Sequence, residues 1–274
     1  EVMYSRTSQG SIAWLISLAL LPFPTVILYF LFGWKLFDDY AAVQSHTGRP
    51  SRIARAHEAS IVDEEANASW RTLAGVAQMP FLAGNEATLL IDGKATFKSI
   101  FAGISRAERV IYAQFYIIRD DRLGREFADR LIERARAGID VHLLYDDVGC
   151  FWLPHRYLRR LTDAGVHISS FNRRHKLLRL FGPARLNYRN HRKLVLVDGK
   201  EAWIGGHNVG VEYLGEDKKL GPWRDTHVHV RGSVVVSAAV MFREDWEWAT
   251  GSPLPSPVMD PPERVGEQPS LLMP

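Results

Sequence analysis

The sequence that decides the fold of this chain is Asn190-His191-Arg192-Lys193-Leu194-Val195-Leu196-Val197-Asp198-Gly199-Lys200-Glu201-Ala202-Trp203-Ile204-Gly205-Gly206-His207-Asn208. Two short apolar runs, residues 194–197 and 202–204, flank the turn dipeptide Asp198-Gly199, which predicts a β-hairpin with a two-residue turn. In the two possible registers His191 lies opposite Gly206 or opposite Asn208. Because side chains alternate between the faces of a strand, one face then carries His191, Lys193 and Asn208.

These three side chains together indicate phosphoryl chemistry without a metal ion. A neutral imidazole acts as a nucleophile or a proton carrier near neutral pH. An ammonium group neutralises one phosphoryl oxygen, and an amide N–H holds another. A lone histidine on a half-buried strand is usually a packed residue and nothing more, but three such groups at this spacing favour a site.

The same stretch resembles the HxKxxxxD signature of the phospholipase D superfamily, followed by that family's Gly-Gly-x-Asn. The resemblance implies that His191 attacks phosphorus and forms a phosphohistidine, while Lys193 and Asn208 hold the non-bridging oxygens. It also identifies Asp198 as the family aspartate. The predicted hairpin places Asp198 at the turn, so we expect a structural or orienting role for it. Neither a metal ion nor an organic cofactor is implied.

Candidate substrate-binding residues flank the motif on both sides. From Arg173 to Lys193 there are eight Lys and Arg residues and no Asp or Glu, interleaved with apolar side chains. This pattern favours an anionic membrane surface over nucleic acid, with Arg189 and Arg192 placed to bind phosphate. A solvated loop is the alternative. Downstream, Trp223-Arg224-Asp225 resembles the family segment that borders the active site, which implies that Trp223 and Asp225 contact substrate.

The rest of the chain predicts an α/β fold. Its 274 residues are 46% hydrophobic and 24% charged with a net charge of +3, which excludes wholesale disorder. The lone Cys150 cannot form an internal disulfide and is expected in the core. Strands are predicted over residues 88–91, 109–118, 139–145 and 166–171, and helices over 95–107, 124–137, 155–164 and 233–249. This alternation predicts a phospholipase D-like α/β sandwich with a mostly parallel sheet.

The N-terminal region predicts a membrane anchor. Residues 7–34 carry no charge, and residues 12–32 are apolar over a length that crosses a bilayer. We expect one transmembrane helix, kinked at Pro22 and Pro24, with a cleaved signal peptide as the alternative. More basic residues follow the segment than precede it, which predicts a catalytic domain on the cytoplasmic side.

Four regions are therefore expected. Residues 1–36 are the transmembrane segment with its flanks, and residues 37–81 are a juxtamembrane connector with a possible helix over 59–77. Residues 82–250 are the catalytic domain with one motif. Residues 251–274 hold half of the prolines and are predicted to be a linker to a missing second half.

In this order of segments the chain resembles the N-terminal half of bacterial cardiolipin synthases of the phospholipase D type. The resemblance implies an inner-membrane phosphatidyltransferase that converts two phosphatidylglycerol molecules to cardiolipin and glycerol. None of the other nine histidines is followed by Lys two residues later, so the chain holds half of a two-motif site. The second motif would come from a missing half or from homodimerisation.

Two other functions stay open at this stage. The chain could be a membrane-anchored, single-motif phosphodiesterase, either a cardiolipin hydrolase or a nuclease, that is active as a homodimer. It could also be a catalytically silent, membrane-bound half-protein that only associates with a partner. The intact motif argues against the silent protein, and the proline-rich tail argues against a self-contained dimer.

Overall fold

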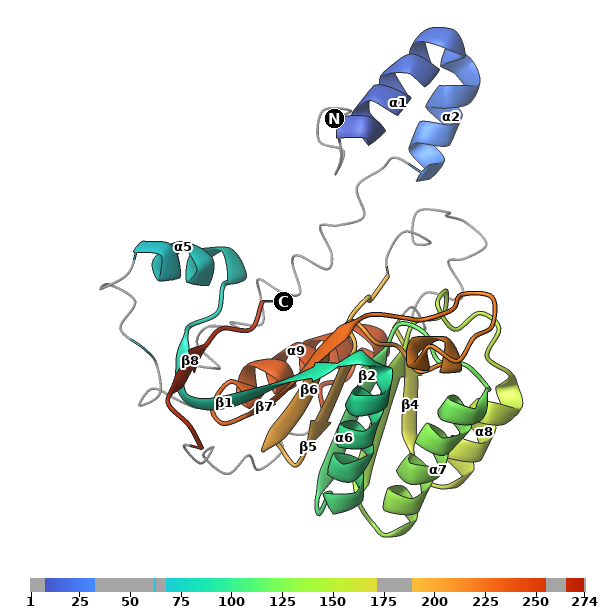
Figure 1. The fold of residues 1–274 in the computed structure, drawn as a ribbon. Coiled ribbons are helices and arrows are strands. Elements are labelled where there is room, and N and C mark those ends of the chain that lie inside the picture. The colour runs from blue at the N-terminus through green and yellow to red at the C-terminus, as the bar shows by residue number, and fades with distance from the viewer. Residues whose placement is uncertain (1–7, 33–61, 63–67, 172–188, 255–264, 274) are drawn as a thin grey trace.

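A computed structural model of the chain describes residues 8–32, 62, 68–171, 189–254 and 265–273 (Figure 1). The described elements are α1 (Ser8–Leu20), α2 (Pro22–Phe32), α5 (Ala68–Ala77), β1 (Leu82–Ile91), α6 (Asp92–Arg106), β2 (Val110–Phe115), α7 (Arg122–Arg136), β3 (Asp140–Tyr145), α8 (His155–Asp163), β4 (His167–Ser170), β5 (Leu194–Val197), β6 (Glu201–Gly205), η5 (Val211–Leu214), β7 (Thr226–Arg231), α9 (Val235–Thr250) and β8 (Gln268–Ser270). The predicted alternation of strands and helices between residues 82 and 250 is present.

The sheet is mixed, which corrects the expectation of a mostly parallel one. Its strand order is β4-β3-β2-β5-β6-β7-β1-β8, and within it only the pairs β2–β3 and β3–β4 are parallel. Crossovers through α7 and α8 bring those strands in parallel, as the sequence pattern indicates. However, β5, β6 and β7 lie between β1 and β2, and each pairs antiparallel with its neighbours. Strand alternation along the sequence does not show which strands are neighbours.

Helices cover both faces of this sheet, α6, α7 and α8 on one face and α9 on the other (Figure 1). The apolar run of β2 supplies both cores because alternate side chains point to opposite faces. Ile111, Ala113 and Phe115 pack with residues of α6 and α7, whereas Tyr112 stacks on Phe242 of α9 with ring centroids 4.6 Å apart. Cys150 is buried in the first of these cores, as expected.

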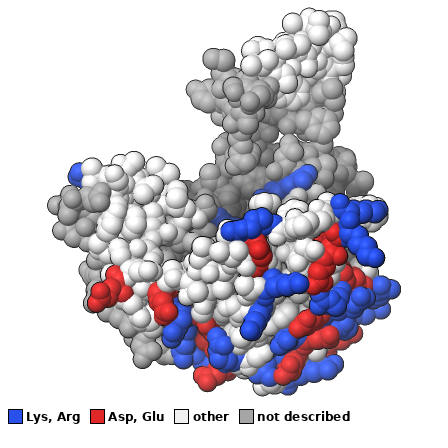
Figure 2. All heavy atoms as spheres, in the orientation of Figure 1, with Lys and Arg blue, Asp and Glu red and all other residues white. Residues whose placement is uncertain are grey.

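The outer face over α6 and α7 interleaves acidic and basic side chains (Figure 2). Its ion pairs include Arg106 with Glu201 at 3.0 Å and Arg125 with Asp120 at 3.6 Å. Such exposed pairs contribute little to stability. This face is therefore a solvated surface without an uncompensated patch of one sign.

The β5–β6 hairpin has a three-residue turn in place of the predicted two-residue one. Leu194 pairs with Ile204 and Val197 with Glu201, which leaves residues 198–200 in the turn. Asp198 has φ 55° and Gly199 φ 68°. The carboxylate of Asp198 accepts hydrogen bonds from three successive backbone N–H groups, those of residues 108, 109 and 110, at 2.8–2.9 Å. These bonds fix the left-handed turn and shift the register by one residue.

The predicted single transmembrane helix is divided into α1 and α2. Proline lacks an N–H group and disfavours helical geometry in the residue before it, so α1 ends at Leu20 and α2 begins at Pro22. The hydroxyl of Thr25 donates to the carbonyl of Ser17 at 2.9 Å across this break, and the two helices lie side by side (Figure 1). Among the described residues, none of the helices combines the length and apolarity needed to span a bilayer.

Two further elements lie in regions expected to be connectors. Helix α5 falls within the connector 37–81 and matches the end of the possible helix there. Strand β8 lies within the proline-rich segment 251–274 and pairs with β1, Leu82 with Ser270 and Asn85 with Gln268. Part of the predicted linker therefore completes the sheet. Residues 255–264, and the basic stretch from 172 to 188, lie outside the described residues.

A substitution at Gly103 tests how α6 packs on the sheet. A Cβ at this position on α6 would overlap the ring of Trp203, which is fully buried under the helix. We expect Gly103→Ala to lower the free energy of unfolding by about 1–3 kcal/mol in urea titrations. The matched control is Gly75→Ala on α5, where a Cβ meets no atom within 4 Å and stability should stay equal or rise by about 0.5–1 kcal/mol. Equal effects of the two changes would contradict this packing.

Candidate active site

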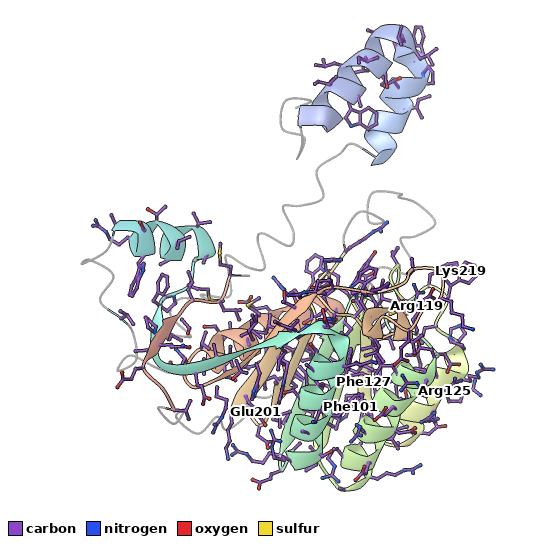
Figure 3. The ribbon with its side chains drawn as sticks, in the orientation of Figure 1. Phe101, Arg119, Arg125, Phe127, Glu201 and Lys219 are labelled. Carbon is purple, nitrogen blue, oxygen red and sulfur yellow. The ribbon has the colours of Figure 1, made fainter. Side chains whose placement is uncertain are left out.

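All the predicted site residues except Asp198 lie toward one end of the strands, where β2, β3 and β6 end and β5 and β7 begin. We call this end the motif edge. The pairs Phe115–Tyr145, Leu194–Ile204 and Gly205–His227 bring these strand ends together. Figure 3 shows Arg119 and Lys219 toward this edge, with Glu201 toward the other end of the sheet. The segments that carry Tyr116, Asp146, His191 and Asn208 therefore converge.

His191 and Lys193 are in direct contact at the motif edge. The ammonium of Lys193 lies 2.9 Å from Nδ1 of His191 and donates to the His191 carbonyl at 2.6 Å. Lys193 is only 4% exposed, whereas His191 is exposed. The ring of Tyr116 lies 4.8 Å from the His191 ring and 5.7 Å from the Lys193 nitrogen. The site thus offers an accessible imidazole backed by a buried cation.

Burial sets the charge states of this pair. Burial lowers the pKa of Lys193 to about 8, although the negative charge of Asp225 acts in the opposite direction and raises it. Burial, and then the positive charge of Lys193, lower the pKa of His191 below its ordinary value. At pH 7 the imidazole is therefore neutral and the amine is still mostly charged. An ammonium group only donates, so Nδ1 accepts its hydrogen bond and the neutral ring carries its own proton on Nε2.

Asp245 on α9 anchors the residues on either side of His191. Its carboxylate is fully buried and accepts hydrogen bonds from Asn190 at 2.7 Å, from Gln114 at 2.8 Å and from the guanidinium of Arg192. Burial alone would raise the pKa of Asp245, but Arg192 and these hydrogen bonds hold it below the ordinary value. The predicted substrate residue Arg192 therefore points its guanidinium to a buried carboxylate.

Asp146 provides a second anchor from the end of β3. Its carboxylate accepts hydrogen bonds from the backbone N–H of Asn190 at 3.0 Å, Val148 at 2.8 Å and Gly149 at 3.0 Å. Asn190 is thus held through its backbone and its side chain by two buried acids. The residue next to His191 has little freedom, which pre-organises the imidazole.

Asn208 lies buried behind the motif edge. Its side-chain oxygen accepts from the N–H of Ile117 at 3.0 Å, and its amide donates to the hydroxyl of Tyr213 at 2.9 Å. Trp223 packs edge-on against Tyr213, with ring centroids 5.1 Å apart. An amide carries two N–H bonds, so one remains for a ligand. Asn208 and Trp223 are therefore joined through Tyr213.

The Gly-Gly of the motif makes room for Asp225. A Cβ at Gly206 would overlap the Asp225 carboxylate, and one at Gly205 would overlap the backbone at Thr226 and His227. Asp225 accepts from the N–H of Thr226 at 2.7 Å, and its negative charge raises the pKa of Lys193. This places the predicted residue Asp225 in support of the Lys193 charge.

The remaining predicted residues lie in different places. Arg189 is exposed and donates to the hydroxyl of Tyr116 at 3.1 Å, beside His191. Asp198 is at the far end of β5, where it serves the turn. Sequence reasoning assigned no role to Tyr116, Asp146, Gln114 or Asn190. A signal existed for two of them, because Gln114 and Asp146 are polar residues within or directly after strongly apolar strands.

Comparisons with known proteins identify the domain that carries these residues. Residues 100–219 match the family model described as "Cardiolipin synthase, PLD-like domain". The chain contains a phospholipase D-like domain. It is 42% identical to cardiolipin synthase A of Pseudomonas aeruginosa strain LESB58 over 97% of its length and 55% of that protein. It is 44% identical to cardiolipin synthase A of Pseudomonas fluorescens strain SBW25 over 90% of the chain and 53% of that protein.

A solved structure similar to the phospholipase D-like domain is NucT from Helicobacter pylori. The TM-score is 0.46 at 15% sequence identity, covering 60% of this chain and 98% of that one. The chain spans about half the length of the curated relatives that it matches.

Asp245→Asn tests the buried anchor. Removing this charge takes the carboxylate away from the partly buried guanidinium of Arg192, and we expect the free energy of unfolding to fall by about 2–3 kcal/mol at pH 7. Because the pKa of Asp245 is lowered on folding, its stabilisation is present above about pH 4 and lost as the pH falls through the folded value. The variant should therefore lose less stability in acid than the native chain. Exposed Asp163→Asn is the control, and an equal loss there would contradict the anchor.

Proposed function

We propose that the chain forms one half of a cardiolipin synthase-type phosphatidyltransferase site. The observation that carries the proposal is the contact between exposed, neutral His191 and the buried ammonium of Lys193. A phosphodiester is an anion and would draw the ammonium from Nδ1 to a non-bridging oxygen. The imidazole is then free to attack phosphorus. The similarity to cardiolipin synthases over most of the chain supports phosphatidylglycerol as the substrate.

The proposed reaction has two displacements at phosphorus. A His191 nitrogen forms a bond to the phosphorus of phosphatidylglycerol, the bond to the glycerol oxygen breaks, and glycerol leaves after taking up a proton. The hydroxyl of a second phosphatidylglycerol then loses a proton, attacks the phosphohistidine and releases His191, which yields cardiolipin. Lys193 and Asn208 stabilise the charge on the phosphoryl oxygens in both steps.

The proton donor and acceptor for the alcohols must come from a second motif-bearing domain. One HxKxxxxD motif is present in the chain, and His191 is already used as the nucleophile. We propose that the second motif belongs to a missing half of the protein, consistent with relatives about twice as long. A homodimer would instead bring together two copies of the same half-site. The alternative function, a single-motif phosphodiesterase, requires that homodimer.

The motif edge also carries exposed apolar side chains that fit a membrane surface. Phe151 and Trp152, in the segment after β3, are 67% and 79% exposed and pack edge-on against each other. Leu220 is likewise exposed, next to Lys218 and Lys219. Exposed aromatic residues with basic neighbours suit an anionic lipid surface. We propose that this edge faces the cytoplasmic side of the bacterial inner membrane and takes its lipid from there.

His191→Ala tests the nucleophile. Bis(p-nitrophenyl) phosphate is a suitable probe because p-nitrophenolate leaves without protonation, so a half-site can complete the first displacement. The native chain should form an acid-labile phosphoenzyme on incubation with this diester, and His191→Ala should form none. His155→Ala, at the exposed start of α8, should behave as the native chain. Undiminished phosphoenzyme in His191→Ala would refute the assignment.

Labelling at residue 152 tests the membrane-facing edge. Because Cys150 is buried, a polarity-sensitive fluorophore attached to the Trp152→Cys variant reports on that position alone. We expect its emission to shift to the blue when vesicles containing phosphatidylglycerol are added, and less so with purely zwitterionic vesicles. The same label on Val76→Cys, an exposed apolar position on α5, is the control. An unshifted label at residue 152 would show that this edge does not contact lipid.

A further inference from the structure

A second cluster of functional side chains lies at the opposite edge of the sheet, where β3 and β4 begin. His142 of β3 is the registered partner of His167 of β4, so their side chains project from the same face of adjacent strands. Asp140 precedes His142 by two residues and shares that face. The proposed phosphatidyl transfer uses none of these three residues.

The donor atoms of this cluster converge on a small volume. Nε2 of His142 lies 2.8 Å from a carboxylate oxygen of Asp140, and Nε2 of His167 lies 3.5 Å from the same oxygen. One ligand atom from each residue lies within 4.8 Å of the other two. The two imidazole rings stack with centroids 4.8 Å apart and an interplanar angle of 21°. Three ligand atoms of types that bind transition metals are therefore already gathered.

His142 is the observation that distinguishes this cluster from a surface ion pair. The residue is 6% exposed, and neither ring nitrogen makes a hydrogen bond of acceptable geometry within the described part of the chain. Nε2 is close to the Asp140 carboxylate, at 2.8 Å, but the contact does not meet hydrogen-bond geometry. Buried polar atoms are seldom left without a hydrogen bond unless a water molecule or an ion satisfies them. A buried ring nitrogen that lacks a hydrogen bond and lies beside a carboxylate and a second imidazole suits a bound cation.

We propose that Asp140, His142 and His167 bind a zinc ion. Zinc takes imidazole nitrogens and carboxylate oxygens at about 2.0–2.2 Å in tetrahedral geometry, which spaces ligand atoms about 3.3 Å apart. The separations of 2.8 and 3.5 Å bracket this value. Two imidazoles favour zinc over magnesium and calcium, which prefer oxygen ligands. A water molecule would occupy the fourth position.

The surroundings support a closed site on its inner side. The rings of Tyr112 and Trp246 lie 5.5 and 4.9 Å from the His142 ring, both edge-on. The ion would join β4, the outermost strand at this side of the sheet, to β3. Its role would therefore be to hold that strand in place.

The test is zinc binding to the whole chain, produced without an affinity tag and stripped of metal. Isothermal titration with zinc chloride should show one equivalent bound, and the melting temperature should rise on addition of zinc but not of magnesium. His167→Ala removes an exposed ligand and should weaken zinc binding at least tenfold while the metal-free protein melts as the native chain does. Asp140→Asn should act in the same direction.

The control is His155→Ala, which removes an exposed histidine outside the cluster and should bind zinc as the native chain does. Undiminished zinc affinity in both His167→Ala and Asp140→Asn would overturn the proposal, because any bound zinc would then lie elsewhere. A native chain that takes up no zinc at millimolar concentration would overturn it as well.

Discussion

The site depends on a carboxylate buried beneath the sheet. Asp245 is fully enclosed on α9, and a charge in that position is tolerated because three donors surround it. Two of these donors, Asn190 and Arg192, flank His191 in sequence. Asp146 holds the backbone of Asn190 from the other side. The imidazole is thus presented to solvent from a segment whose neighbours cannot move, which is the pre-organisation that displacement at phosphorus requires.

Lys193 and His191 are in contact but differ in burial, because Lys193 is buried and His191 is exposed. Because burial lowers the pKa of the amine, the cation is poised to release its proton just above neutral pH. Its charge in turn keeps the adjacent imidazole neutral. In the proposed reaction, this one short contact provides both the nucleophile and an electrostatic partner for the phosphoryl oxygens. It does not provide the acid for the leaving alcohol, and this is the chemical reason for proposing a second domain.

Much of this could be predicted from the sequence because the decisive signals are local. The apolar runs of the hairpin are a short-range pattern, and the hairpin that they predict is present in the structure. The break between α1 and α2 also has a local cause, the proline at position 22. The expectation of one continuous helix rested instead on the length of the apolar segment. The length of the turn depends on the hydrogen bonds that the Asp198 carboxylate accepts from the backbone N–H groups of residues 108–110. No property of residues 198–199 reveals these bonds.

Long-range pairings could not be predicted. The mixed sheet arises because β5, β6 and β7 lie between β1 and β2, an order that alternating elements leave open. The role of Asp245 was missed for the same reason, because its partners Asn190 and Gln114 lie far from it in sequence. Arg192 was expected to bind phosphate, because its position next to His191 in the sequence gives no indication of a buried partner.

The most direct test of the account is the pH dependence of the first displacement. We would measure the rate of p-nitrophenolate release from bis(p-nitrophenyl) phosphate in a single turnover between pH 5 and 10. The account predicts a rate that rises as His191 loses its proton below its ordinary pKa, and that falls above about pH 8 as Lys193 loses its charge. A rate that continued to rise through pH 9 would show that the Lys193 ammonium is not required, and would contradict the central claim.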